Sequence, residues 1–399
     1  MNIFKSYLIT LFSTAAIVAC GDDASTDKPI AGESNSYFVS AEQTATVSLP
    51  VLQSFAQLSG ETEFLKLLKY AVTKYTIVYK TTFKGEVIDA SGVLFIPEGI
   101  RDAAPLLSLQ HGTEFVKSDA PSTSSDPTGM EYFASAGYIA FMPDFVGYGK
   151  SSQIFHPYYD RTSSAQSVID MIKAVKEYLR EHKIAFNDKL FLAGYSEGGY
   201  VTLAAAKEID TNASHDLKVT AVAAGAGGYD LSSMLESVTQ AEHYAYPSYL
   251  AFVLTAYNKT YDWGRPTSDF FNEPYAKAID TYLNGNYSGS FLNSKLTTTV
   301  SALLNQDFYA SLSQSNGELV VKRALADNSV LGWKTDIPIL LYHGTADEII
   351  PFTNSERTLQ NFKSNGANQV SLITIPKGTH GSSFVPMLRD FVPRFETLR

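Results

Sequence analysis

The chain has 399 residues, a hydrophobic share of 45% and a formal net charge of −10 at pH 7. This length suits one α/β domain with an insertion, and the acidic balance argues against a nucleic-acid surface or a polybasic membrane patch. A single cysteine excludes an internal disulfide. No segment resembles a Cys/His metal cluster or a phosphate loop, so we expect neither a metal nor a cofactor.

Residues 1–19 are typical of an export signal, with Lys5 ahead of an apolar stretch that is too short for a stable spanning helix. Ile17-Val18-Ala19-Cys20 resembles a bacterial lipobox, so we expect a lipid anchor on Cys20. The alternative is an ordinary signal peptide that is cleaved nearby. Residues 20–45 are rich in Asp, Ser, Thr, Ala and Gly and predict a flexible linker.

The segment 46–228 is predicted to form the first part of an α/β core. Residues 61–72 have a helical pattern, and Thr73–Phe83 with Glu86–Ile96 indicate a leading hairpin. Further on, 105–110 indicates a buried strand, 163–182 a helix and 217–225 another strand.

A serine lies on a predicted strand-to-helix turn. The strand 189–193 is followed by Gly194-Tyr195-Ser196-Glu197-Gly198-Gly199 and then by a helical pattern over 200–209. A G-x-S-x-G sequence in this setting is typical of a nucleophile elbow, in which the glycines allow a tight turn. The alternative is a glycine-rich turn with an exposed serine. We predict that Ser196 is a nucleophile.

An orienting acid and a base should follow the serine in that order. Asp347 follows the apolar strand 337–344, and His380 follows the strand 369–376, where open α/β sheets place their ligand crevice. The alternatives are a turn or helix-capping role for Asp347 and a solvated loop position for His380. Glu348 and Asp336 are rival acids. The other histidines fit the role of base less well.

The oxyanion of an acyl-transfer reaction needs backbone donors. We expect the N–H groups of Thr113, after the strand 105–110, and Glu197, after the nucleophile. His111 is expected to support this loop.

Residues 229–334 form a long insertion with many aromatic residues. Loops of this length are usually structured and functional, so we predict a mostly helical cap over the site. Most of its rings should form the core of the cap, and a few should face Ser196. Residues 335–399 complete the α/β core.

These segments, together with residues 137–151 and 156–158, resemble the α/β-hydrolases and, more narrowly, the secretory lipase and esterase group. The resemblance implies a mostly parallel central sheet flanked by helices, with Ser196, Asp347 and His380 as the catalytic triad. The chain also resembles that family in Asp144, Gly147 and Gly149, and we favour a role in loop rigidity for these three residues. Whether residues 156–158 line a substrate pocket stays open.

We therefore expect a monomeric serine hydrolase that cleaves small-molecule, lipid or polymer esters at the bacterial cell envelope, either periplasmic or surface-exposed, with secretion as the alternative. Two other functions stay open. A serine peptidase of the prolyl-oligopeptidase type shares the elbow but usually has a large N-terminal propeller. A non-catalytic lipoprotein on a hydrolase scaffold would lack a triad member.

Overall fold

The computed structural model describes residues 36–58, 60 and 62–399. Its centre is a nine-stranded sheet with the order β1-β2-β3-β5-β4-β6-β7-β8-β9, antiparallel from β1 to β5 and parallel from β5 to β9. The strands are β1 (Phe38–Val47), β2 (Val72–Phe83), β3 (Glu86–Pro97), β4 (Ala104–Gln110), β5 (Ile139–Pro143), β6 (Phe186–Tyr195), β7 (Ala221–Gly225), β8 (Ile339–Gly344) and β9 (Val370–Ile375).

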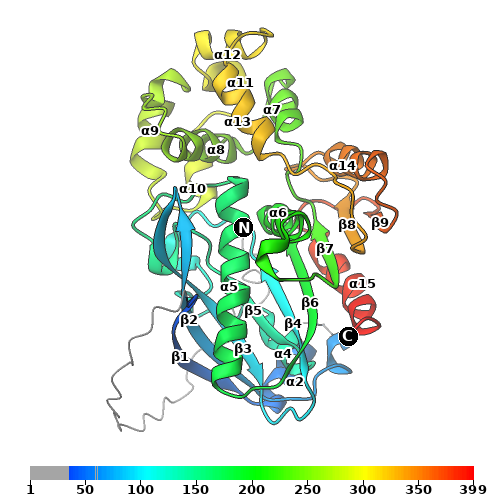
Figure 1. Cartoon of the computed structure of the whole chain (residues 1–399). Coiled ribbons are helices and arrows are strands. Elements are labelled where there is room, and N and C mark those ends of the chain that lie inside the picture. The colour runs from blue at the N-terminus through cyan, green and yellow to red at the C-terminus, as the bar shows by residue number, and fades with distance from the viewer. Residues whose placement is uncertain (1–35, 59, 61) are drawn as a thin grey trace.

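Helices cover both faces of the sheet (Figure 1). Because side chains alternate along a strand, Leu190 and Leu192 of β6 join the core on one face, and Phe191 and Ala193 join the core on the other. The helices of the α/β core are α2 (Leu49–Leu58), α3 (Thr62–Leu65), α4 (Met130–Ser135), α5 (Arg161–Glu181), α6 (Glu197–Thr211), α14 (Phe352–Ser364) and α15 (Phe384–Glu396). The prediction of a mainly parallel sheet between helical layers is confirmed.

The N-terminal part of the core differs from the sequence prediction. The linker was expected to extend to residue 45, but β1 begins at Phe38 and pairs antiparallel with β2. This strand is largely exposed and polar, so backbone pairing to the edge of β2, rather than apolar burial, accounts for it. The helix expected over 61–72 is shorter, since α3 ends at Leu65 and β2 begins at Val72. The expected export signal and Cys20 lie outside the described residues.

The insertion 229–334 is mostly helical and gathers at one end of the sheet (Figure 1). Its helices are α7 (Leu231–Gln240), α8 (Pro247–Thr260), α9 (Tyr275–Tyr282), α10 (Gly289–Asn293), α11 (Val300–Leu303), α12 (Gln306–Leu312) and α13 (Leu319–Asn328). Phe270, Phe271 and Tyr257 are buried in its interior, as expected for most of these rings.

A loop of the core that includes Tyr158 and Tyr159 contacts this insertion. The carbonyl of Tyr159 accepts hydrogen bonds from the hydroxyls of Tyr200 on α6 at 3.0 Å and Tyr257 on α8 at 2.9 Å. The ring of Tyr158 stacks on Phe252 of α8 with centroids 4.5 Å apart. Core and insertion are therefore joined by a buried hydrogen bond as well as by apolar packing.

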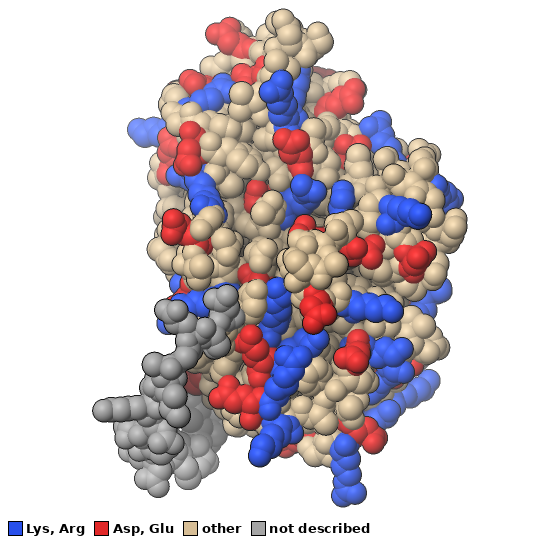
Figure 2. Space-filling model, viewed as in Figure 1, with Lys and Arg blue, Asp and Glu red and all other residues tan. Residues whose placement is uncertain are grey.

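The charged side chains are mixed on the surface. On the face shown in Figure 2, Lys and Arg are interspersed with Asp and Glu. This face therefore presents no continuous basic stripe.

None of the helices in the described part of the chain has the length and apolar character needed to cross a bilayer.

Candidate active site

Ser196 occupies a sharp turn between β6 and α6. Its φ of 60° and ψ of −124° are unusual for a residue with a side chain, and such a conformation costs about 1–3 kcal/mol. The turn demands glycine on both sides. A Cβ on Gly194 would lie 2.2 Å from the carbonyl oxygen of Gly198, and one on Gly198 would lie 2.1 Å from that of Gln110. The G-x-S-x-G pattern is therefore a requirement of close backbone approach.

The close approach at Gly198 makes a stability prediction. Gly198→Ala forces backbone atoms apart, so we expect a loss of about 1–3 kcal/mol in the free energy of unfolding, as for other overpacked sites. Thermal denaturation followed by circular dichroism measures it. Gly112→Ala is the matched control, because its Cβ would meet its nearest atom at 3.6 Å, an ordinary contact. Equal melting temperatures for the two variants would contradict the steric explanation.

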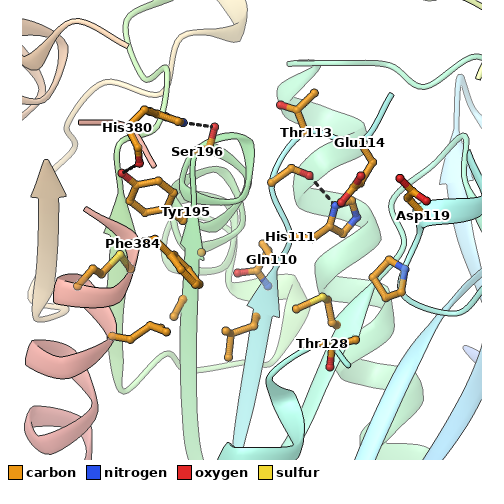
Figure 3. Close-up of a pocket in the computed structure, with 18 of the residues that line it drawn as sticks. Gln110, His111, Thr113, Glu114, Asp119, Thr128, Tyr195, Ser196, His380 and Phe384 are labelled. Carbon is orange, nitrogen blue, oxygen red and sulfur yellow. Dashed lines mark hydrogen bonds between the residues drawn. The ribbon is translucent and has the colours of Figure 1, made fainter. Parts of the chain in front are cut away.

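The three predicted triad side chains form one hydrogen-bonded chain (Figure 3). The Oγ of Ser196 lies 2.9 Å from the Nε2 of His380. The Nδ1 of His380 lies 2.8 Å from the Oδ2 of Asp347. A carboxylate only accepts, so Nδ1 carries the proton and Nε2 is left free to accept from the serine hydroxyl. The three residues follow the ends of β6, β8 and β9. Ser196 and His380 are 184 positions apart in the sequence.

Asp347 is held as a carboxylate by several donors. Its Oδ1 accepts from the N–H groups of Ile349 and Ile350, both at 2.9 Å. Its Oδ2 faces His380 and also the Nε2 of His343 at 3.2 Å. Burial opposes ionisation, but the hydrogen bonds from His343 and His380 outweigh it and hold the pKa of Asp347 well below its ordinary value. The turn role considered as an alternative for Asp347 is thus present together with the contact to His380.

His343 supports Asp347, a role that is not expected from the sequence. Its ring is fully buried, with Nδ1 2.6 Å from the Oγ of Ser355 and Nε2 2.9 Å from the carbonyl oxygen of Ile350. Its contacts therefore hold the turn that carries Asp347. The spacing of four residues between His343 and Asp347, at the end of a buried strand, is the only signal that could have indicated it.

Glu348 points to a different atom of the base. Its Oε2 accepts from the backbone N–H of His380 at 3.0 Å, so it positions the loop and does not contact the ring. Asp336 precedes β8 and lies outside this hydrogen-bonded chain. The hydroxyl of Tyr195 donates to the carbonyl oxygen of His380 at 2.7 Å (Figure 3). The backbone of His380 is thus held on both its N–H and its carbonyl.

The two predicted oxyanion donors lie on the loop after β4 and on the first residue of α6. Thr113 and Ser196 line the same cavity, and Gly112 approaches the Cβ of Ser196, with its own ideal Cβ at 3.8 Å from that atom. Within the described residues, the N–H groups of Thr113 and Glu197 donate to no backbone carbonyl. Both groups are therefore available to a ligand beside Ser196.

The loop of Thr113 rests on buried polar contacts. His111 contacts the carbonyl oxygens of Gly112 at 2.8 Å and Asp144 at 3.1 Å, and its ring stacks on Phe145. The Asp144 carboxyl is buried and accepts from the Oγ of Ser91 at 2.6 Å. These contacts agree with the predicted structural roles of His111 and Asp144.

Ser196 lies between two cavities. One, of about 140 Å³, extends beside β4 and α15 and is shown in Figure 3. The other, of about 60 Å³, lies under the insertion, where Tyr244 and Tyr249 join aliphatic side chains of α7 and α8. Tyr158 lines the second cavity, whereas His156 lines neither and contacts Glu197 instead. In the described part of the chain, no cluster of three or more His, Cys, Asp or Glu could hold a metal ion.

The chain is similar to lipases of Candida albicans and Malassezia furfur. Lipase 4 of Candida albicans is 22% identical over 285 residues, which cover 68% of this chain and 57% of that protein. The secreted triacylglycerol lipase LIP4 of Malassezia furfur is 21% identical over 354 residues, which cover 84% of this chain and 59% of that protein. The chain thus spans little more than half the length of these curated relatives.

Among solved structures, the rice cell wall degrading esterase LipA from Xanthomonas oryzae is similar, with a TM-score of 0.79 and 26% identity. The alignment covers 91% of this chain and 99% of that one, which confirms the α/β-hydrolase fold. Residues 116–385 match the secretory lipase family, and this segment contains all three residues of the hydrogen-bonded chain. The chain belongs to the secretory lipase family.

Proposed function

We propose that this protein is a serine hydrolase that cleaves carboxylic esters through Ser196, His380 and Asp347. The observation that supports it most is the continuous path from the Oγ of Ser196 through both ring nitrogens of His380 to a buried carboxylate. A serine hydroxyl is a weak nucleophile by itself and needs an adjacent base that a third group orients. Membership of the secretory lipase family agrees with this chemistry.

The reaction begins when His380 Nε2 takes the proton of Ser196 as its Oγ attacks the ester carbonyl carbon. Asp347 keeps the proton on Nδ1 and stabilises the imidazolium. The tetrahedral oxyanion accepts from the N–H groups of Thr113 and Glu197. When the intermediate collapses, the imidazolium gives its proton to the departing alcohol. Water then attacks the acyl-enzyme by the same route, and the acid is released.

The two cavities suit the two halves of an ester. The cavity under the insertion is lined mainly by Leu, Val, Met and Tyr side chains, so it accommodates an apolar or ring-containing group. The other cavity is lined by apolar side chains that include Met142 and Phe391 and by the acidic residues Glu114 and Asp119. Triacylglycerols and cell-wall esters, named for relatives of this chain, are both substrate classes to test. Export is supported by the family and by the secreted relatives, and lipid attachment at Cys20 stays a prediction.

Labelling with a fluorophosphonate tests the proposal. We expect the folded protein to form a covalent adduct on Ser196, found by mass spectrometry of the peptide, because only an activated serine reacts quickly with this probe. Heat-unfolded protein is the control and should not react, since the path from Ser196 to Asp347 exists only in the fold. Folded protein that is inert to the probe would support the non-catalytic alternative.

A panel of substrates then separates esterase from peptidase. We expect turnover of p-nitrophenyl esters from acetate to long-chain acyl groups and no cleavage of dipeptidyl p-nitroanilides. The described residues before β2 form only β1, α2 and α3, so this part of the chain contains no propeller of the kind typical of prolyl oligopeptidase-like enzymes. Faster cleavage of the anilides than of the esters would favour the peptidase.

A further inference from the structure

A buried carboxyl–imidazole pair lies directly beside the serine. Glu197 is the first residue of α6, its side chain is 1% exposed, and its Oε1 lies 2.7 Å from the Nε2 of His156. The Nδ1 of His156 lies 2.7 Å from the carbonyl oxygen of Val146. These contacts are separate from the path between Ser196 and Asp347, and ester cleavage as described above does not use them.

The contacts of His156 determine how many protons the pair holds. The carbonyl oxygen of Val146 can only accept, so Nδ1 must carry a proton. The short contact between Nε2 and Oε1 requires one more proton, on either the nitrogen or the oxygen. An imidazolium with a carboxylate and a neutral imidazole with a carboxylic acid have the same sum of charges. In either form the pair is electrically neutral.

That neutrality matters because of where Glu197 lies. Its own N–H is one of the two proposed oxyanion donors, at a helix N-terminus that favours negative charge. An uncompensated carboxylate there would repel the oxyanion and compete with it for the helix dipole. The second oxygen, Oε2, is buried and has no hydrogen-bond partner within the described residues, so no other side chain offsets the charge.

We propose that His156 is a positioning residue that keeps Glu197 in a neutral, hydrogen-bonded pair, so that the 197 amide faces the oxyanion with no carboxylate charge beside it. This inference rests on the proposed function. It assigns His156 to the charge balance of the oxyanion site, whereas the sequence left open whether residues 156–158 line a substrate pocket. The pair also holds the elbow against the 146–156 loop across 41 positions of the chain.

The tyrosines around the pair contribute no charge of their own near neutral pH, and Glu114 is a further carboxyl group that acts on Tyr148 and Tyr249 as Glu197 does. The neighbours that face Glu197 or pack on His156 are Tyr148, Tyr158, Tyr159 and Tyr249. Burial raises the pKa of all four, to about 12 for Tyr249. His111 lies beyond Phe145, which stacks on both imidazole rings.

His156→Gln separates charge from hydrogen bonding. Glutamine still offers an N–H to Glu197, but it cannot take the positive charge that balances a carboxylate. We expect kcat for a p-nitrophenyl ester to fall about 10- to 100-fold at about pH 8, with KM little changed, because the charge acts on the transition state. The loss should shrink as the pH is lowered, because protonation of a carboxylate removes its charge. Wild-type enzyme should show no such additional slope.

The double variant His156→Gln/Glu197→Gln provides the decisive comparison. Two neutral amides replace the neutral pair, so we expect most of the lost kcat to return and the additional pH dependence to vanish. His215→Gln is the matched control, because it alters another histidine–glutamate contact, to Glu208 at 3.1 Å, away from the serine. This control should leave kcat unchanged.

Losses that add in the double variant, or a loss in His156→Gln that does not vary with pH, would show that His156 only packs and would overturn the proposal. If His156→Gln does not fold, His156→Asn retains a donor toward Val146 and can replace it in the same comparison with Glu197→Gln. Fluorophosphonate labelling of the wild type keeps the two questions apart. If the wild type is labelled and active but the losses of the two substitutions add, the role of His156 is contradicted and the proposed function is not. If the wild type is inert, the proposed function is contradicted, and this inference with it.

Discussion

Ser196→Ala is expected to lower kcat for p-nitrophenyl esters by about 10⁵- to 10⁶-fold, as for removal of the nucleophile in other serine hydrolases. Without Oγ, no acyl-enzyme can form, and His380 has no hydroxyl to deprotonate. The oxyanion donors and the cavities persist, so some acceleration over water remains. Steady-state kinetics with p-nitrophenyl butyrate measure the change, and circular dichroism checks the fold.

Ser237→Ala is a suitable control for the serine variant. Ser237 is an exposed serine of α7 whose hydroxyl bonds within its own helix, so its loss should leave kcat as it is. An alanine variant at 196 that hydrolyses esters at the rate of wild type, and still reacts with fluorophosphonate, would show that another residue is the nucleophile.

Asp347→Asn is expected to lower kcat by about 10³- to 10⁴-fold, with a small effect on KM. The asparagine oxygen can still accept from Ile349 and Ile350, which directs its NH₂ group toward His380. Nδ1 must then accept, so the ring proton moves to Nε2. His380 in that tautomer donates toward Ser196 and cannot remove its proton.

Glu348→Gln separates the two neighbouring acids. The amide oxygen of glutamine can still accept from the N–H of His380, so we expect a loss of less than about tenfold, in line with one hydrogen bond to a neutral acceptor. Both variants are assayed with the same ester at the same pH. A larger loss for the change at 348 than for the change at 347 would reverse the assignment of the acid.

The triad could be predicted because each member leaves a local trace. Ser196 has glycines where backbone atoms approach too closely for a side chain, and Asp347 and His380 each follow a short apolar strand. Parallel strands end at one edge of a sheet, so residues in these positions meet even when they are far apart in the chain. The order serine, acid, histidine along the sequence then fits the α/β-hydrolase fold.

Other features leave no such trace. β1 has a polar sequence and owes its conformation to the free edge of β2, which a local pattern cannot indicate. The contact between His156 and Glu197 spans 41 positions and depends on how the 146–160 loop crosses the start of α6. The sequence places the acidic residue Glu197 directly after the predicted nucleophile, but its partner is visible only in three dimensions.

The setting of Asp347 has a consequence for the base. Three of the four groups that hydrogen-bond or pair with its carboxylate come from residues 343–350, and only one comes from His380. This octapeptide stretch is thus a self-contained cradle for an anion. Replacement of His380 therefore leaves the carboxylate of Asp347 with three of its four partners, so we expect this charge to stay compensated in a variant that has lost the base.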